Sequence, residues 1–241
     1  MSEPRMKDET GKVLFNLEVA EDFYLLRLAI PHIAAGVVPG QFVEVRVSSN
    51  FSPFLRIPLS ICKTDPVAGT IDLLYEDMGA KSRALSLQRS GCEIACLGPL
   101  GHGFKVPAAD RAAILVGGGI GTPPLLFLGE ELRRASRQVA LLVGARSANK
   151  HLPDNLLNAA AGEVQKATDD GSNGHHGLVT DLLKEKLAAG KKYTVYTCGP
   201  HAMMAAVAGI CQDFEVPCQA SLEEYMACGF GNGGLYMLHA P

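Results

Sequence analysis

The sequence lacks a long, uninterrupted hydrophobic run. Its most apolar stretch, residues 112–128, is broken by glycines and by Pro123-Pro124, and residues 1–12 are charged. A membrane-spanning helix needs about 20 consecutive apolar residues, and a secretory signal needs an apolar core. We therefore expect neither a membrane span nor a secretory signal.

The sequence also lacks an excess of basic residues. Its 22 lysines and arginines and its 25 aspartates and glutamates give a formal net charge of −3, with a pI near 6.2. Nucleic acids and anionic membranes are bound by basic patches, and no run of Lys and Arg forms one here. A small molecule or another protein is the expected ligand.

Paired cysteine motifs are missing as well. The seven cysteines are odd in number, and none has the C-x-x-C spacing of a zinc site. This excludes a disulfide-rich secreted scaffold and predicts a reducing cytoplasm. His175-His176 lie in a loop rich in Gly and Asn without a third ligand, so we expect a solvated pair there and no metal site.

The sequence does contain two different patterns of predicted secondary structure. Residues 13–105 read as short strands between turn signals, as in a small antiparallel barrel or sandwich. The predicted strands are 13–19, 24–30, 42–47, 59–62 and 70–75. From residue 112 strands alternate with helices, which indicates a parallel sheet. The strands predicted there are 112–116, 139–143 and 193–197, and the helices lie near 124–136, 153–161, 179–189 and 202–213.

The change in the pattern of secondary structure predicts two domains of different fold class. A short polar connection that contains Pro107 separates them. We expect a first, antiparallel domain at 1–107, an α/β nucleotide-binding domain at 108–218, and a short C-terminal segment at 219–241.

A glycine-rich turn joins the strand at 112–116 to the following helix. It reads Gly117-Gly118-Gly119-Ile120-Gly121-Thr122-Pro123, which is not a strict G-x-G-x-x-G. Glycine lets the backbone approach a pyrophosphate, and the N–H groups and dipole of a helix start favour an anion. A tight turn without a ligand is the alternative.

Two further segments are expected at the same edge of the sheet. Gly144-Ala145-Arg146 follows the second strand of this domain and Cys198-Gly199-Pro200 follows the last one. Open α/β sheets bind ligands at the carboxyl ends of their strands. The alternative for Cys198 is a small buried core residue.

In the first domain, Arg56-Ile57-Pro58-Leu59-Ser60 places an arginine at the start of a strand. A guanidinium there can hold a phosphate, and the backbone can meet a flat ring. A solvated surface arginine is the alternative.

The order of these motifs resembles the ferredoxin reductase superfamily from residue 10 to residue 231. The motifs are Pro39-Gly40-Gln41-Phe42, Arg56–Ser60, Gly98–Phe104, Gly117–Pro124 and Cys198–Pro200. Within that superfamily, segments 98–104, 168–180 and 221–231 resemble the electron-transfer subunit of heterotetrameric dihydroorotate dehydrogenase.

The resemblance implies an α+β two-domain fold with an N-terminal antiparallel β-barrel that binds FAD and a C-terminal α/β parallel-sheet domain that binds NAD. It also implies a C-terminal segment with cysteines for a [2Fe–2S] cluster. The implied partner is the FMN-containing catalytic subunit of dihydroorotate dehydrogenase, an enzyme of pyrimidine biosynthesis, in a heterotetramer. Electrons would pass from that FMN through the cluster and the FAD to NAD.

The resemblance also assigns residues by position. For FAD they are Arg56 beside the phosphates, Ile57, then Pro58, Leu59 and Ser60 against the isoalloxazine ring, Leu74, Tyr75 and Glu76 along the ribityl and adenine side, and Gly79, Lys81 and Ser82 in the second phosphate loop. For NAD they are Gly117, Gly118, Gly119, Ile120, Gly121, Thr122, Pro123, Gly144, Arg146, Gly199 and Pro200. The implied catalytic residues are Ser60, Cys198 and Glu223, and the implied cluster ligand is Cys228.

Two departures from the family pattern matter. The second phosphate loop of the family reads Gly-x-Gly-Thr, whereas Lys81 stands at its second glycine here; a lysine can pair with phosphate as a point charge. After Cys228 the positions of later cluster cysteines hold Gly233 and Tyr236. A cluster needs four thiolates, so we expect none, whether the cause is a frameshift, a truncation or a genuine loss.

Three functions follow as hypotheses. The first is an electron-transfer subunit that couples NAD to a partner through FAD, and the second is a stand-alone NAD(P)H–flavin reductase without a cluster. The third is a regulatory or scaffold protein that has lost its cofactors. Residues such as Arg146 and Lys150 leave NAD against NADP open, and the resemblance favours NAD.

Overall fold

The computed structural model describes residues 6–47, 55–222 and 235–236. The chain divides into two compact units that meet in sequence between Gly103 and Phe104. No helix in these described ranges is long and apolar enough to cross a membrane.

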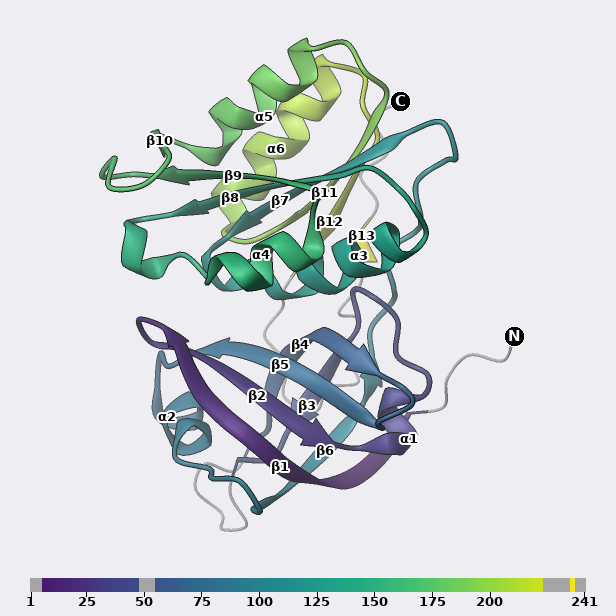
Figure 1. Ribbon diagram of the computed structural model, residues 1–241, viewed down its shortest axis with the longest axis vertical. Helices are drawn as coiled ribbons and strands as arrows, with labels where there is room; N and C mark the ends of the chain where they lie inside the picture. The colour runs from purple at the N-terminus through teal and green to yellow at the C-terminus, as the bar shows by residue number, and fades with distance from the viewer. Residues whose placement is uncertain (1–5, 48–54, 223–234, 237–241) are drawn as a thin grey trace. The chain divides into compact units, whose positions relative to one another are not determined.

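The first unit is a closed antiparallel barrel with the strand order β1-β2-β5-β4-β3-β6 (Figure 1). Its strands are β1 (Lys7–Ala20), β2 (Phe23–Ala29), β3 (Phe42–Val45), β4 (Ile57–Asp65), β5 (Thr70–Glu76) and β6 (Glu93–Leu100), with helices α1 (Pro31–Ala34) and α2 (Ala80–Ser86). The barrel closes because β1 pairs with β2 along one edge and with β6 along the other. The prediction of a barrel is therefore confirmed, and the alternative of a sandwich is wrong.

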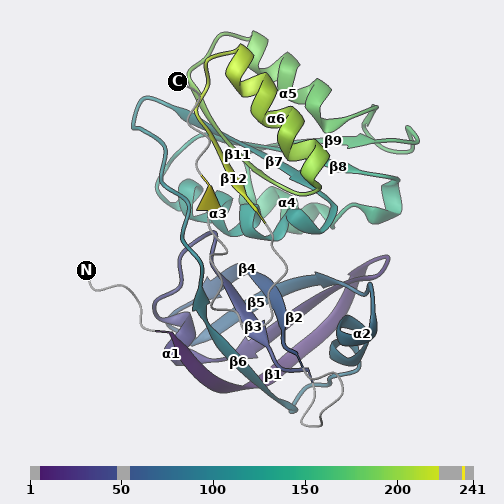
Figure 2. The ribbon, with the colours of Figure 1, turned by 180° about the vertical axis from the view of Figure 1, so that it is seen from behind.

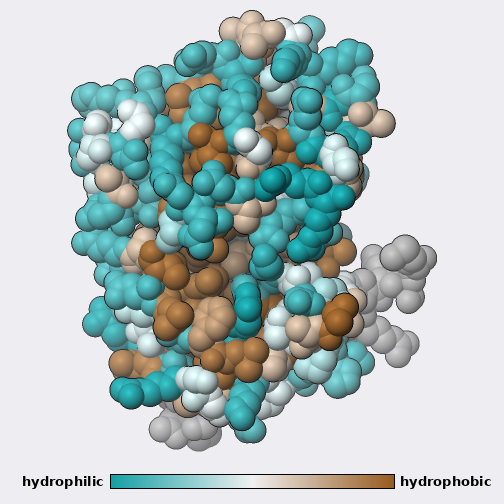
Figure 3. Space-filling model, viewed as in Figure 1, coloured by the Kyte–Doolittle hydropathy of each residue, from teal (hydrophilic) through white to brown (hydrophobic). Residues whose placement is uncertain are grey.

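The core of the barrel follows from strand alternation. Val43 and Val45 on β3 point to one face and are fully buried, as is Cys96 on β6, which pairs with Val45. Strand β6 was not predicted, because Gly98 and Pro99 make its sequence read as a turn. Helix α2 was not predicted either. Apolar side chains also reach the outside: Leu17 and Leu87 are 57% and 71% exposed, and hydrophobic residues gather on the visible surface of this unit (Figure 3).

The second unit is a seven-stranded sheet with the order β10-β9-β8-β7-β11-β12-β13. All its pairs are parallel except the last, between β12 and β13. Helices α3 and α4 cover one face and α5 and α6 the other (Figures 1 and 2). The elements are β7 (Ala112–Gly118), β8 (Val139–Ala145), β9 (Glu163–Thr168), β10 (His175–His176), β11 (Tyr193–Cys198), β12 (Cys218–Ser221), β13 (Leu235–Tyr236), α3 (Pro123–Arg134), α4 (Asp154–Ala160), α5 (Val179–Ala188) and α6 (His201–Asp213), with short 3₁₀ turns η1 (Gly119–Gly121) and η2 (Ala148–Lys150).

Strand β7 lies at the point where the order of the strands in the sheet reverses. The next strand, β8, adds on one side of β7, whereas β11 adds later on its other side. The loops after β7 and β11 therefore leave toward opposite faces from neighbouring strand ends, which is the arrangement at which α/β sheets bind nucleotides. The strands β9 and β12 were not predicted, because their sequences EVQKAT and CQAS carry little apolar signal.

Candidate functional site

The carboxyl ends of three strands bring the predicted nucleotide segments together. Gly117 pairs with Val143 on one side and with Cys198 on the other, and Gly118 pairs with Gly144. The glycine-rich turn, Gly144 and the segment after Cys198 therefore lie at one edge of the sheet, although they are far apart in sequence.

The glycines of this edge have different jobs. A Cβ at Gly121 would lie 2.4 Å from the Gly199 backbone, and one at Gly118 would lie 2.6 Å from Met203 Sδ. These glycines let the turn pack against the start of α6. Gly119 is different: its φ is +52°, and a Cβ there would meet no atom of the described residues within 4 Å. The open space beside Gly119 is where a ligand can approach the backbone.

The start of α3 offers fewer donors than a helix usually does. Its first two residues are prolines, which have no N–H. Thr122 donates both its N–H and its hydroxyl to the Gly119 carbonyl, at 3.2 and 2.9 Å. The expectation of free N–H groups is therefore wrong at Thr122 and Pro123, and an anion would be met by the part-exposed Gly119 and Ile120.

The other predicted residues of this edge vary in exposure. Arg146, just after β8, and Pro200, the N-cap of α6, are exposed, while Cys198 is 1% exposed at the end of β11. A buried thiol at this place matches the small-core-residue alternative and is poorly placed to touch a substrate.

In the barrel, the start of strand β4 and the end of strand β5 are not paired with each other. Their pairing runs from Asp65 opposite Thr70 only to Ile61 opposite Leu73. Beyond that point β4 pairs with β3 over 57–60, and β5 pairs with β2 over 74–76. The predicted FAD residues at 56–60 and at 74–76 therefore stand on the two sides of one opening in the sheet.

Two cations gather at the start of β4. The Arg56 side chain is largely buried, and its Nη2 pairs with both carboxylate oxygens of Asp8, at 3.0 and 2.8 Å. Lys81 reaches across from α2 and donates its Nζ to the Arg56 carbonyl, at 3.0 Å. An arginine and a lysine side by side suit a pyrophosphate.

Ser82 and Gly79 build the start of α2. Ser82 Oγ accepts the N–H groups of Met78 and Gly79, both at 2.9 Å, and the side chain is buried. A Cβ at Gly79 would meet nothing within 4 Å. The serine therefore shapes the loop, while the glycine leaves its backbone open to a ligand.

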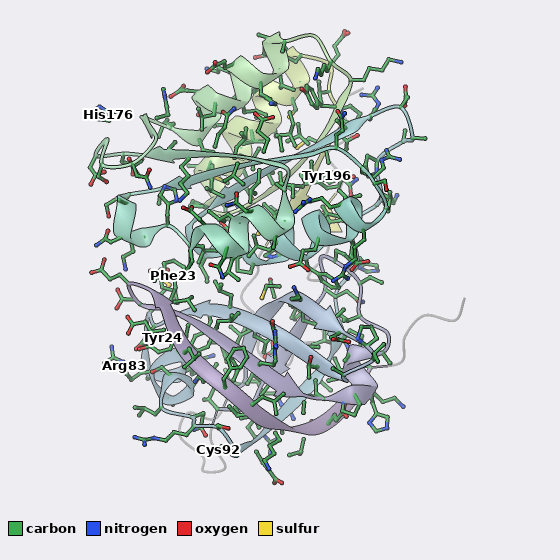
Figure 4. The ribbon with its side chains drawn as sticks, in the orientation of Figure 1. Phe23, Tyr24, Arg83, Cys92, His176 and Tyr196 are labelled. Atoms are coloured by element: carbon green, nitrogen blue, oxygen red, sulfur yellow. The ribbon has the colours of Figure 1, made fainter. Side chains whose placement is uncertain are left out.

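Leu74 and Tyr75 are buried, with exposures of 2% and 1%. Tyr75 donates its hydroxyl to Asn16 Oδ1 at 2.9 Å and stacks on Tyr24, a residue of β2 that Figure 4 labels. Burial raises the pKa of the Tyr75 hydroxyl well above its usual range. These side chains belong to the barrel wall, so a cofactor would meet this strand through its backbone or through the less buried Glu76.

Three predicted features lie outside the described residues. They are the catalytic Glu223, the cluster ligand Cys228 and the position of Gly233. Over the residues that the structure does describe, no three His, Cys, Asp or Glu side chains are grouped as metal ligands. None of the six cysteines within those ranges forms a disulfide.

Comparison with known proteins shows which sequences and folds this chain is similar to. Residues 115–209 match the family model described as the oxidoreductase NAD-binding domain. An electron transfer subunit of dihydroorotate dehydrogenase B (NAD(+)) from Desulforamulus reducens is 39% identical over 92% of this chain and 84% of its own length. The subunit of the same name from a Geobacillus strain is 39% identical over 94% and 87%.

The chain belongs to this family of electron transfer subunits. Its fold is also that of a solved NADH-dependent reduced ferredoxin-NADP oxidoreductase, with a TM-score of 0.81 and 28% identity over 92% of this chain and 79% of that one. A ferredoxin NADP+ reductase from Neisseria gonorrhoeae with bound FAD and NADP shares the fold at a TM-score of 0.73, with 16% identity over 90% and 99% of the two chains. The resemblance stated from the sequence is confirmed.

Proposed function

We propose that this chain is a flavoprotein electron-transfer subunit, which passes electrons between NAD(H) and the FMN-containing catalytic subunit of dihydroorotate dehydrogenase by way of FAD. The names of its relatives support the partner and the reaction. The observation that carries the proposal is that one chain holds both an opened barrel edge with two cations and a glycine turn at the reversal point of a parallel sheet.

Bound FAD would supply the redox chemistry, because a flavin exchanges a hydride with nicotinamide and single electrons with a partner. The residues of the barrel fit that cofactor. Arg56 and Lys81 offer positive charge for its phosphates, and Gly79 leaves its backbone open. Pro58 and Ser60 share one face of β4, where a flat ring can lie.

The α/β unit fits NAD at the edge described above. Gly119 and Ile120 would meet the phosphates, and Gly144, Arg146, Gly199 and Pro200 would surround the nucleotide. The exposed Arg146 can also accept a 2′-phosphate, so it does not itself select NAD; the relatives named for NAD(+) favour NAD. Ser60 and Glu223 stay proposals as catalytic residues, while a catalytic role for Cys198 would require its thiol, which is 1% exposed, to become accessible.

A stand-alone NAD(P)H–flavin reductase is the second candidate. It is favoured by one observation: of the family's cluster cysteines only Cys228 is present, with Gly233 and Tyr236 at later positions. For either function we propose a cytoplasmic location, which is supported by reduced cysteines among the described residues.

The purified protein tests these functions in two steps. We expect flavin absorbance near ~450 nm and bleaching by NADH under anaerobic conditions. Absence of a flavin that also cannot be restored by added FAD would overturn both candidates and leave the scaffold hypothesis. Copurification with an FMN-containing dihydroorotate dehydrogenase, followed by dihydroorotate-dependent NADH formation, separates the subunit from the stand-alone reductase.

A further inference from the structure

Glu44 is a buried carboxyl group with an unused oxygen. It lies on β3 with 3% of its surface exposed, and its Oε1 has no hydrogen-bond partner among the residues that the structure describes. An unpaired buried polar atom destabilises the folded state, so such a group calls for a physical reason. A valine at this position, like its neighbours Val43 and Val45, would avoid that cost.

The direction of Glu44 follows from its register. Residues opposite each other in an antiparallel pair project from the same face, and Glu44 is paired with Pro58 while Phe42 is paired with Ser60. Val43 and Leu59 point the other way, into the barrel core. Glu44 therefore shares the outer face on which Pro58 and Ser60 are proposed to meet FAD.

The neighbours of Glu44 place it along the length of the cofactor. Ser60 marks the end proposed for the flavin ring, and Arg56 marks the phosphate end. Glu44 lies nearer the phosphate end than Ser60 does, because it is paired with Pro58, the ring residue closer to Arg56, and its own carbonyl oxygen accepts a hydrogen bond from Arg56 Nη1 at 3.3 Å. Between the ring and the phosphates, a flavin nucleotide has a single segment, the ribityl chain with its three hydroxyl groups.

We infer that the Glu44 carboxyl accepts a hydrogen bond from a ribityl hydroxyl of the bound flavin, and so positions the chain between ring and phosphates. The inference rests on the proposed FAD site. The carboxyl is suited to this task because its free oxygen can only be satisfied by a donor, and hydroxyls are the donors that this segment offers. Burial raises its pKa, against the opposing effect of the Lys81 and Arg56 charges.

The experiment compares FAD with its 2′-, 3′- and 4′-deoxyribityl analogues, by titration into apoprotein. For the natural protein we expect one of the analogues to bind roughly 10-fold more weakly than FAD, the loss that a hydrogen bond to a charged group predicts. In Glu44→Leu that difference should vanish, while Glu44→Gln, which keeps an acceptor oxygen, should retain part of it. Glu93→Leu removes an exposed carboxylate of β6 and should behave like the natural protein.

The alternative role is purely electrostatic, with Glu44 orienting Lys81 and Arg56. In that case Glu44→Leu would change the affinity for FAD and for every analogue by the same factor, and this result would overturn the inference. Equal binding of FAD and all three analogues by the natural protein would overturn it as well. Far-UV circular dichroism identifies a misfolded Glu44→Leu, and the Glu44→Gln comparison then decides. A natural protein that binds no FAD at all would instead contradict the proposed function.

Discussion

Arg56 has one partner within the chain and a second, proposed partner in the cofactor. Its guanidinium already pairs with Asp8; the Arg56 side chain is largely buried, but the Asp8 side chain is 58% exposed, so solvent screens this ion pair and weakens it. A phosphate that binds both Arg56 and Lys81 can displace it. We propose that a bound phosphate would take the place of the Asp8 carboxylate beside Arg56.

Replacement of Arg56 by Ala should weaken FAD binding by roughly 10- to 100-fold, the equivalent of a charge-assisted pair of about 1.5–3 kcal/mol. The fold should persist, because the guanidinium packs no core. FAD titration measures the effect, and Asp8→Asn is the matched control: it releases the same guanidinium and should leave the affinity equal or higher. Unchanged affinity of Arg56→Ala would show that the assigned role is wrong.

A second ion pair is a stability element. Arg27 donates Nε and Nη2 to the two oxygens of the buried Asp72, at 2.6 and 2.7 Å, and also lies over the Phe15 ring. Because Arg27 is partly exposed, we expect Asp72→Ala to lower the free energy of unfolding by about 1–3 kcal/mol.

Urea unfolding followed by far-UV circular dichroism measures this loss, since the chain has no tryptophan. The exposed pair of Lys192 with Asp110 is the control, and Lys192→Ala should produce no measurable change. A similar loss in both variants would mean that burial of Asp72 is not what matters.

At the scale of elements, the turn between β7 and α3 separates two kinds of glycine. Gly119→Asn should fold, since Asn tolerates the left-handed conformation at φ +52°, yet its side chain would fill the open space beside the backbone. We expect NADH to reduce the flavin of this variant at least 10-fold more slowly, with FAD content unchanged. Stopped-flow absorbance near ~450 nm measures the rate.

Gly121→Ala is the contrasting variant of the same turn. A Cβ there would overlap the Gly199 backbone, so this change should lower the stability of the α/β unit itself. If NADH reduced the flavin of Gly119→Asn at the natural rate, or if this variant lost its FAD as well, the turn would not be the place where NAD binds.

The sequence predicted the elements that have a clear local signal and missed those that do not. Strand β7 and helix α3 are apolar or amphipathic and bounded by Gly and Pro, and both were predicted. Strand β6 is held by pairing with β1 and β3 from distant parts of the chain, which no local pattern reveals.

The same limit applies to the site. Arg56 and the glycine turn could be found from motifs, but Glu44 could not. In the pattern Val43-Glu44-Val45 an alternating Glu reads as a solvent-facing residue, whereas the structure buries it. Likewise, only the approach of the Gly199 segment distinguishes Gly121 from Gly119.

For the whole molecule, we predict that protein of this sequence holds no [2Fe–2S] cluster. Cys228 alone cannot supply four thiolates, and the other six cysteines lie within the barrel and the α/β unit. NADH would still reduce the FAD, but without a cluster electrons must leave the FAD directly, so rapid one-electron delivery to the FMN of a partner should fail. Iron and acid-labile sulfide in anaerobically purified protein are the test; about two irons per chain would contradict it.

The closure of the barrel also bears on how the chain folds as it is synthesised. Strand β1 is made first, but Lys7 pairs with Gly98 of the last barrel strand. Such distant pairing makes closure slow, because the intervening chain must be ordered before the contact is gained. Until β6 leaves the ribosome, β1 has an open edge that other chains can pair with. Nascent chains that end before residue 93 should therefore be cut rapidly by protease, and chains long enough to expose β6 should be protected.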